Sequence, residues 1–147
     1  VSVATTHKGG LVVGMRSLPG NPYDGHTLHA ALEQVANLTQ RQPKEVFVDL
    51  GYRGAAIPAG VKVYHRKLKR GITARIERDI RRRSAIEPAI GHMKNDGRLR
   101  RNWLKGTAGD AFHALLCGCG HNLRMILRKL RLLLALILVR LYRQPVL

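Results

Sequence analysis

Residues 45–50, EVFVDL, form a nearly continuous apolar run with an aspartate close to its end. Such a run, without polar alternation, is typical of a β-strand covered on both faces. A strand of that kind needs helices packed on its sheet, which limits the chain to the α/β class. Asp49 then lies at the C-terminal end of the strand, where α/β sheets commonly place functional groups. An aspartate before a Gly-Tyr turn can also simply cap that turn, so the run leaves both interpretations open.

Short β-branched segments and amphipathic segments alternate along the rest of the chain. Residues 1–6 and 11–16 flank two glycines and predict a hairpin. Later patterns predict a helix from Asp24 or Thr27 to Gln40, a strand over 61–65 and helical segments from 73 onward. They also predict a last helical region over 108–142 that is broken near Gly118 and Gly120. The order predicts a mixed sheet with flanking helices. Its strands are few, and we therefore expect an N-terminal part of the domain upstream of residue 1.

Positive charge dominates the composition. Twenty-six Lys and Arg face nine Asp and Glu, which gives a formal net charge of +17 at pH 7. This excess predicts a polyanionic partner, with nucleic acid favoured over an anionic membrane surface, although a merely solvated basic surface is the alternative.

The two cysteines, Cys117 and Cys119, are separated by one residue. That spacing argues against a secreted disulfide scaffold and predicts a cytoplasmic protein.

The longest apolar run, LRLLLALILV, lies near the C-terminus and is interrupted by Arg131. Its uninterrupted part, 132–139, is far shorter than the roughly 20 residues that a membrane-spanning helix needs. We therefore expect no membrane span. The run predicts a buried or interface helix, and a helix on a membrane surface is the less favoured alternative.

A single acid, Glu87, lies within the basic stretch RRRSAIEPAIGHMK at 81–94. At helical spacing, Arg83, Glu87 and Lys94 share one stripe. Pro88 removes a backbone donor and predicts a bend in the helix, which could turn Glu87 toward the sheet. The alternative is an ordinary Arg–Glu pair on a solvated helix face.

Two isolated carboxylates in so basic a chain, Asp49 and Glu87, suggest a site for a divalent cation. Mg²⁺ is commonly held by one or two carboxylates together with substrate phosphate. We expect the two acids to lie at the same end of the sheet, with Arg83 or Lys94 reaching toward them.

The loop after the stretch at 81–94 carries four residues expected to contact DNA phosphates: Arg98, Arg100, Arg101 and Lys105. Trp103 among them could stack on an unpaired base or, as we favour, anchor the loop to the core.

Four segments resemble a known family of enzymes. They are NPYDGHTL at 21–28, VDLGYRG at 48–54, RRSAIEPAIGHMKNDGRLRRNWLKGTAGD at 82–110, and CGHNLRMILRKL at 119–130. Together they resemble the C-terminal part of the catalytic domain of DDE transposases of bacterial insertion sequences, of the insertion sequence four and five type. This resemblance implies a ribonuclease-H-like fold over 1–107 and a closing helical segment over 108–147. It also implies metal-dependent cleavage and strand transfer of DNA, and a homo-oligomer is possible for the intact enzyme.

The resemblance places the family's second Asp at Asp49 and its Glu at Glu87, as ligands of Mg²⁺ (or Mn²⁺). Arg83 and Lys94 occupy the supporting basic positions of the same motif. Its tyrosine position holds Ile80 instead, which removes a hydroxyl that could contact phosphate. No residue here matches the family's first Asp, and we expect Asp24 to cap or support a helix.

The missing match leaves two classes of function open. The first is a transposase part that is inactive alone and works within the intact enzyme. The second is an inactive, non-catalytic remnant that binds DNA through its basic surface.

Overall fold

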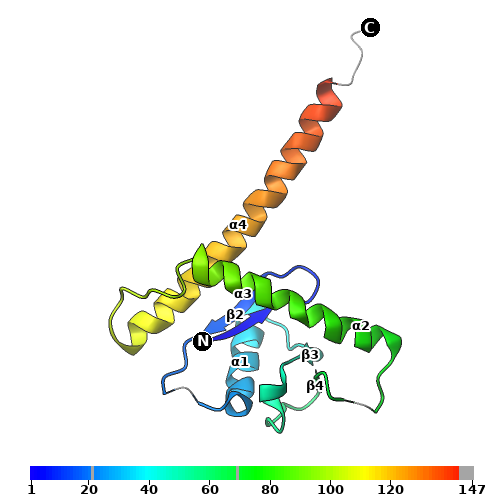
Figure 1. Cartoon of the computed structure of the whole chain (residues 1–147), viewed down its shortest axis with the longest axis vertical. Helices are drawn as coiled ribbons and strands as arrows, with labels where there is room; N and C mark the ends of the chain where they lie inside the picture. The colour runs from blue at the N-terminus through cyan, green and yellow to red at the C-terminus, as the bar shows by residue number, and fades with distance from the viewer. Residues whose placement is uncertain (21, 69, 143–147) are drawn as a thin grey trace.

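The computed structural model describes residues 1–20, 22–68 and 70–142, and its strands form two small sheets. In the first, β1 (Ser2–Thr5) pairs antiparallel with β2 (Val12–Arg16), as the predicted hairpin requires. In the second, β3 (Glu45–Phe47) pairs in parallel with β4 (Lys62–Tyr64). Both sheets lie beneath a row of helices, and one long helix extends away from them (Figure 1).

The expectation of one mixed sheet is therefore wrong for the described residues, since the hairpin and the parallel pair share no ladder. Pro43 before β3 and the turn at Asp49 after it keep that strand to three residues. The strand is also less covered than its apolar sequence suggests, because none of its residues is fully buried.

Helix α1 (Asp24–Thr39) buries Leu28, Leu32 and Val35 along one face, as the predicted spacing requires. Leu28 and Leu32 pack with Val61 in a core that supports the parallel sheet. Asp24 does not cap this helix by a side-chain hydrogen bond, because Tyr23 occupies the N-cap position. Asp24 instead lies in the first turn, where its negative charge suits the helix dipole.

Two helices follow β4 and lie end to end across the sheets (Figure 1). Thr73 caps α2 (Ala74–Arg82), a short 3-10 segment η2 (Arg83–Ala85) follows, and α3 (Ile86–Asn95) begins directly after it. The interruption comes before the proline rather than at it, which corrects the predicted bend. Pro88 is the third residue of α3, where a missing N–H costs no helical hydrogen bond. Because residue 88 cannot donate to the Ser84 carbonyl, the preceding turn is tightened instead.

The last helix, α4 (Gly106–Tyr142), is continuous, so the predicted break at Gly118 and Gly120 is wrong. Its first part packs on β2 and α3, where Ala114 and Cys117 join Met15 and Met93 in a second core. The packing offsets the roughly 1 kcal/mol that a glycine costs inside a helix. Here the side-chain amide of Asn122 donates to the Val12 carbonyl and accepts from its N–H, both at 2.8 Å.

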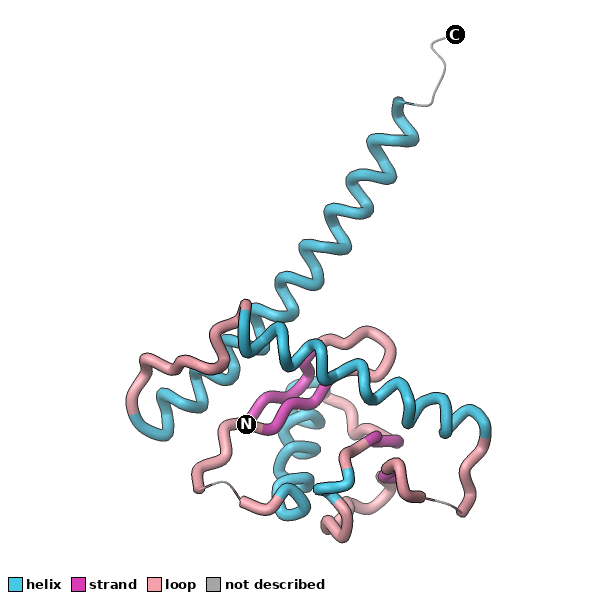
Figure 2. The backbone as a smooth tube through the Cα atoms, in the orientation of Figure 1, coloured by secondary structure: helices cyan, strands magenta, loops and turns pink. Residues whose placement is uncertain are grey.

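Beyond this contact α4 leaves the rest of the molecule (Figure 2), and every residue from Ile126 to Tyr142 is exposed. Among the described residues, no helix is both long and apolar enough to span a membrane. The predicted boundary between 107 and 108 lies close to the start of α4, and the division into two parts stays a prediction.

Candidate active site

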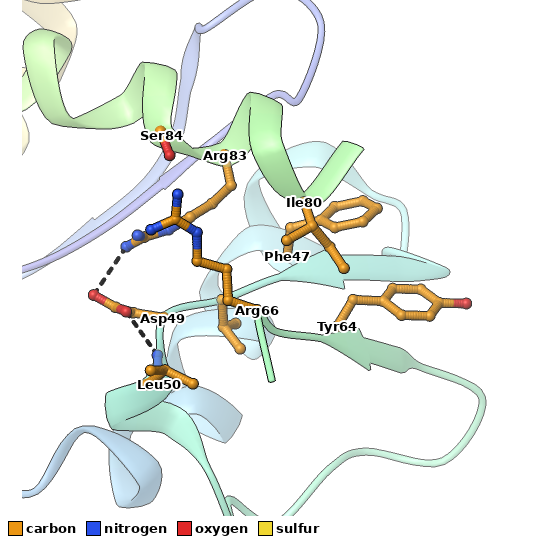
Figure 3. Close-up of a pocket in the computed structure, with 9 residues that line it drawn as sticks. Phe47, Asp49, Leu50, Tyr64, Arg66, Ile80, Arg83 and Ser84 are labelled. Carbon is orange, nitrogen blue, oxygen red and sulfur yellow. Dashed lines mark hydrogen bonds and ion pairs between the residues drawn. The ribbon is translucent and has the colours of Figure 1, made fainter. Parts of the chain in front are cut away.

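Asp49 lies two residues beyond the end of β3 and uses its two carboxylate oxygens for different contacts. The Leu50 N–H donates to Oδ1 at 2.7 Å, which caps the 3-10 turn η1 (Leu50–Tyr52). The capping role left open by the sequence is therefore present. Oδ2 lies 3.3 Å from Nη2 of Arg83. The strand end thus holds Asp49 in a fixed position and still leaves one oxygen directed at the helices above (Figure 3).

Arg83 joins the two predicted acids. Its Nη1 lies 3.4 Å from Oε1 of Glu87, one helical turn further along. The predicted approach of Arg83 to both acids is confirmed by these two ion pairs. The Arg83 side chain is 27% exposed, whereas those of Asp49 and Glu87 are 59% and 66% exposed. The Arg83 side chain is therefore more buried than either carboxylate, and both carboxylates remain open to a ligand.

A small pocket lies beside this group, between the end of the parallel sheet and the underside of α2 and η2. Its apolar wall includes Phe47, Tyr64 and Ile80, and Arg66 and Arg83 point into it (Figure 3). Ile80 is buried there, at the position where the family motif has a tyrosine.

The sequence patterns did not single out Arg66, because it lies in a basic loop with no motif around it. One feature could have identified Arg66: it follows β4, the strand that pairs in parallel with β3. The carboxyl ends of parallel neighbours meet at one edge of a sheet, so the residues after β3 and β4 lie close together.

The chemistry of the donors can be compared with the needs of a divalent cation. Within residues 1–20, 22–68 and 70–142, no three His, Cys, Asp or Glu side chains gather as a metal-binding group. The pair Asp49 and Glu87 supplies hard oxygen ligands from two rigid elements, which fits one Mg²⁺ that also takes water and phosphate oxygens. With Arg83 already contacting both acids, the guanidinium would have to shift for one ion to bind between them.

Two other predicted groups are not brought to this pair. Lys94 lies seven residues beyond Glu87 on α3, about 10 Å along the helix axis, and within the described parts of the chain it forms no ion pair. The basic loop follows the far end of α3, with its four basic residues all exposed: Arg98, Arg100, Arg101 and Lys105.

The expectation that Trp103 anchors this loop is wrong, since its side chain is 63% exposed. The Arg98 guanidinium carbon lies 5.5 Å from the centre of the Trp103 ring. Leu99 instead packs on the core around Met93. Because Leu99 packs on the core, the Trp103 ring stays at the surface. The part of its face that Arg98 does not cover is available to a ligand.

Comparison with known protein families gives a match over most of the chain. Residues 1–123 match the family described as the transposase DDE domain. No curated protein and no solved structure matches the chain. The matched region contains both acids and ends where α4 begins to leave the rest of the molecule.

Proposed function

Because this chain belongs to the transposase DDE domain family, we propose that Asp49 and Glu87 are two acids of a centre for metal-dependent DNA cleavage and strand transfer. The centre would act on the ends of a bacterial insertion sequence and on target DNA. The sheets and helices around it would be part of a ribonuclease-H-like domain. These assignments rest on the family and on the residues that match its motifs.

The observation that carries the proposal is the sharing of one guanidinium by two acids 38 positions apart in the sequence. Asp49 comes from a strand end and Glu87 from the first turn of a helix, and Arg83 contacts both. An ordinary i,i+4 pair on a solvated helix would need only Arg83 and Glu87. The added approach of Asp49 favours a site over a surface ion pair.

The neighbouring cations suit a phosphodiester substrate. When the acids hold Mg²⁺ or Mn²⁺, the cation supplies charge stabilisation at the reacting phosphate oxygens. Arg83 and Arg66 would grip the phosphate from the pocket side, since a guanidinium can donate two parallel hydrogen bonds to it. Lys94 and the basic loop would hold the backbone further along α3, which positions the DNA without reading its sequence.

A non-catalytic DNA-binding remnant is the second candidate. It is favoured by the small number of acids at the site and by Arg83, which neutralises both of them. The two candidates differ in one property that does not require turnover. An active-site part should bind a divalent cation at Asp49 and Glu87 when phosphate is present, and a remnant should not.

Mn²⁺ binding followed by electron paramagnetic resonance tests this, with a short duplex present to supply phosphate. We expect Glu87→Gln and Asp49→Asn each to weaken Mn²⁺ binding about tenfold or more, because each removes one of two anionic ligands. Glu77→Gln is the matched control. Glu77 also pairs with an arginine one turn away, at 2.6 Å, but on α2 and in contact with Arg81.

Arg83→Gln separates the two proposed effects of the Arg83 guanidinium, which are competition with the metal ion for the acids and binding of DNA phosphate. Without DNA it should strengthen Mn²⁺ binding, since the competing guanidinium is gone. With DNA it should weaken binding of the duplex. The catalytic assignment is contradicted if Glu87→Gln and Glu77→Gln leave Mn²⁺ binding equally unchanged.

A further inference from the structure

Helix α4 carries apolar side chains that recur every seven residues along one exposed face. The first series is 46% to 64% exposed and consists of Leu116, Leu123, Leu130 and Ile137. A second series, offset by three or four residues, consists of Phe112, Cys119, Ile126 and Leu133. Alternating steps of three and four residues, kept over more than three heptads, form the seam by which one helix packs against another in a coiled coil.

The seam lies opposite the face that already has a partner. Ala114, Cys117, Gly118 and His121 are buried, and Met15 of β2 lies against this side of α4. The two apolar series occupy the other side, and they continue without interruption into the part of α4 that projects from the molecule (Figure 2). The seam therefore begins beside the folded body and extends along the projecting helix.

The distribution of charge identifies which kind of helix fits. In this register Arg124, Arg128 and Arg131 lie on the face away from the seam, and Lys129 flanks it. Arg140 takes the next position of the second series, so the apolar seam ends at Ile137. Between Phe112 and Ile137, two copies of α4 could thus pack without bringing their arginines together. A membrane surface is less well matched, because Leu132, Leu138 and Val139 interrupt the basic face with apolar residues.

The available area also suits a second copy. Eight apolar side chains, each about half exposed, offer on the order of 800 Å² per chain, which is typical of one side of a stable protein–protein interface. Leu127, Leu134 and Leu141 widen the seam on one edge. We propose that the chain self-associates through this seam, with α4 of a second copy lying alongside it.

Molar mass in solution tests the proposal on the full chain, measured by sedimentation equilibrium in high salt so that nucleic acid does not bridge the copies. We expect the wild type to have at least twice the 16.4 kDa of one chain. Leu130→Glu should reduce the mass to that of a single chain, because it buries a charge in the seam. Leu132→Glu, the same change two residues away on the opposite face, should leave the mass unchanged.

Circular dichroism of both variants establishes that α4 remains helical, and Leu130→Ala provides a second variant without added charge. It should weaken association in the same direction, with an apparent dissociation constant raised about tenfold or more. A wild type with the mass of one chain would overturn the proposal, and so would equal dissociation by Leu130→Glu and Leu132→Glu. A single-chain wild type that binds anionic lipid vesicles would point instead to a membrane surface.

Discussion

Gly118 lies where α4 packs against β2. A Cβ atom at this position would be 3.1 Å from both Met15 Sδ and Val12 Cγ1. Gly120 is two residues away on the same helix, and a Cβ atom there would lie 3.5 Å from the flexible end of Arg124, an ordinary contact distance. The two glycines are therefore alike in sequence context and different in packing.

We predict that Gly118→Leu destabilises the fold by about 1 to 3 kcal/mol, because the added side chain would force α4 away from the hairpin. Gly120→Ala should stabilise it by roughly 0.5 to 1 kcal/mol, the usual gain for this change inside a helix. Urea unfolding followed by circular dichroism measures both changes. If Gly118→Leu were harmless, the close contact between α4 and β2 would not contribute to stability.

At the same scale, helical spacing was sufficient to predict Arg83 and Glu87 as neighbours. The approach of Asp49 was instead expected from the isolation of the two acids in a basic chain and from the resemblance to the transposase family. Arg66 could not be predicted in this way. Its position depends on the pairing of two three-residue strands, which no local pattern of residues specifies. The exposure of Trp103 was also missed, since the neighbouring Leu99 fills the core position expected for the larger ring.

Among the elements, α2 is tied to β3 and to the hairpin loop by a network of four charged or polar side chains. Arg75 donates to both carboxylate oxygens of Glu45, at 2.7 and 3.1 Å, and lies 3.2 Å from Asp79. His7 Nε2 lies 3.1 Å from the other oxygen of Asp79, and the His7 ring stacks on Phe47. The network fixes α2, and with it η2 and Arg83, over the parallel sheet.

Hydrogen bonds from Arg75 lower the pKa of Glu45, with burial acting in the opposite direction. Burial works to raise the pKa of Asp79, but the hydrogen bond from His7 and the charges of His7 and Arg75 outweigh it, so that this pKa is also lowered. Both acids therefore stabilise the fold above their unfolded pKa values of about 4, and the stabilisation is lost as pH falls through the lower folded values.

We predict that the double variant Glu45→Gln, Asp79→Asn loses stability less steeply than the wild type when pH falls from roughly 5 to 3. At pH 7 it should be less stable than the wild type, because Arg75 loses both of its ionic partners. Urea midpoints across this pH range measure the difference, and Glu77→Gln serves as the control on the exposed side of α2. Parallel pH profiles for the wild type and the double variant would contradict the prediction.

At the scale of the whole molecule, the order of strands and helices follows from hydrophobic periodicity, whereas the sheet arrangement does not. The hairpin, α1 and α2 lie where their patterns predict them, since each is set by local spacing and turn residues. The division into two sheets depends on which strand edges meet, and the continuity of α4 depends on tertiary packing at Gly118. Neither is a property of a short segment of sequence.

The net charge of +17 is also a property of the whole chain, and it raises the question of whether DNA binding follows total charge or its placement. Two variants of equal charge separate these possibilities, each with four basic residues replaced by alanine and a net charge of +13. The loop variant changes Arg98, Arg100, Arg101 and Lys105, and the helix variant changes Arg128, Lys129, Arg131 and Arg140. All eight residues are exposed, so neither variant disturbs the core.

We predict that the chain binds duplex DNA with little sequence preference and that its affinity falls steeply with salt, because each neutralised phosphate adds about 0.9 to the log–log slope. The loop variant should lose about 3 to 4 of that slope if all four residues contact phosphate. The helix variant should lose much less, since the part of α4 that carries its four residues extends away from the rest of the molecule (Figure 1). Fluorescence anisotropy of a labelled duplex, titrated at several salt concentrations, measures both slopes. An equal loss in the two variants would mean that binding follows net charge alone, and salt-independent binding would contradict phosphate contacts altogether.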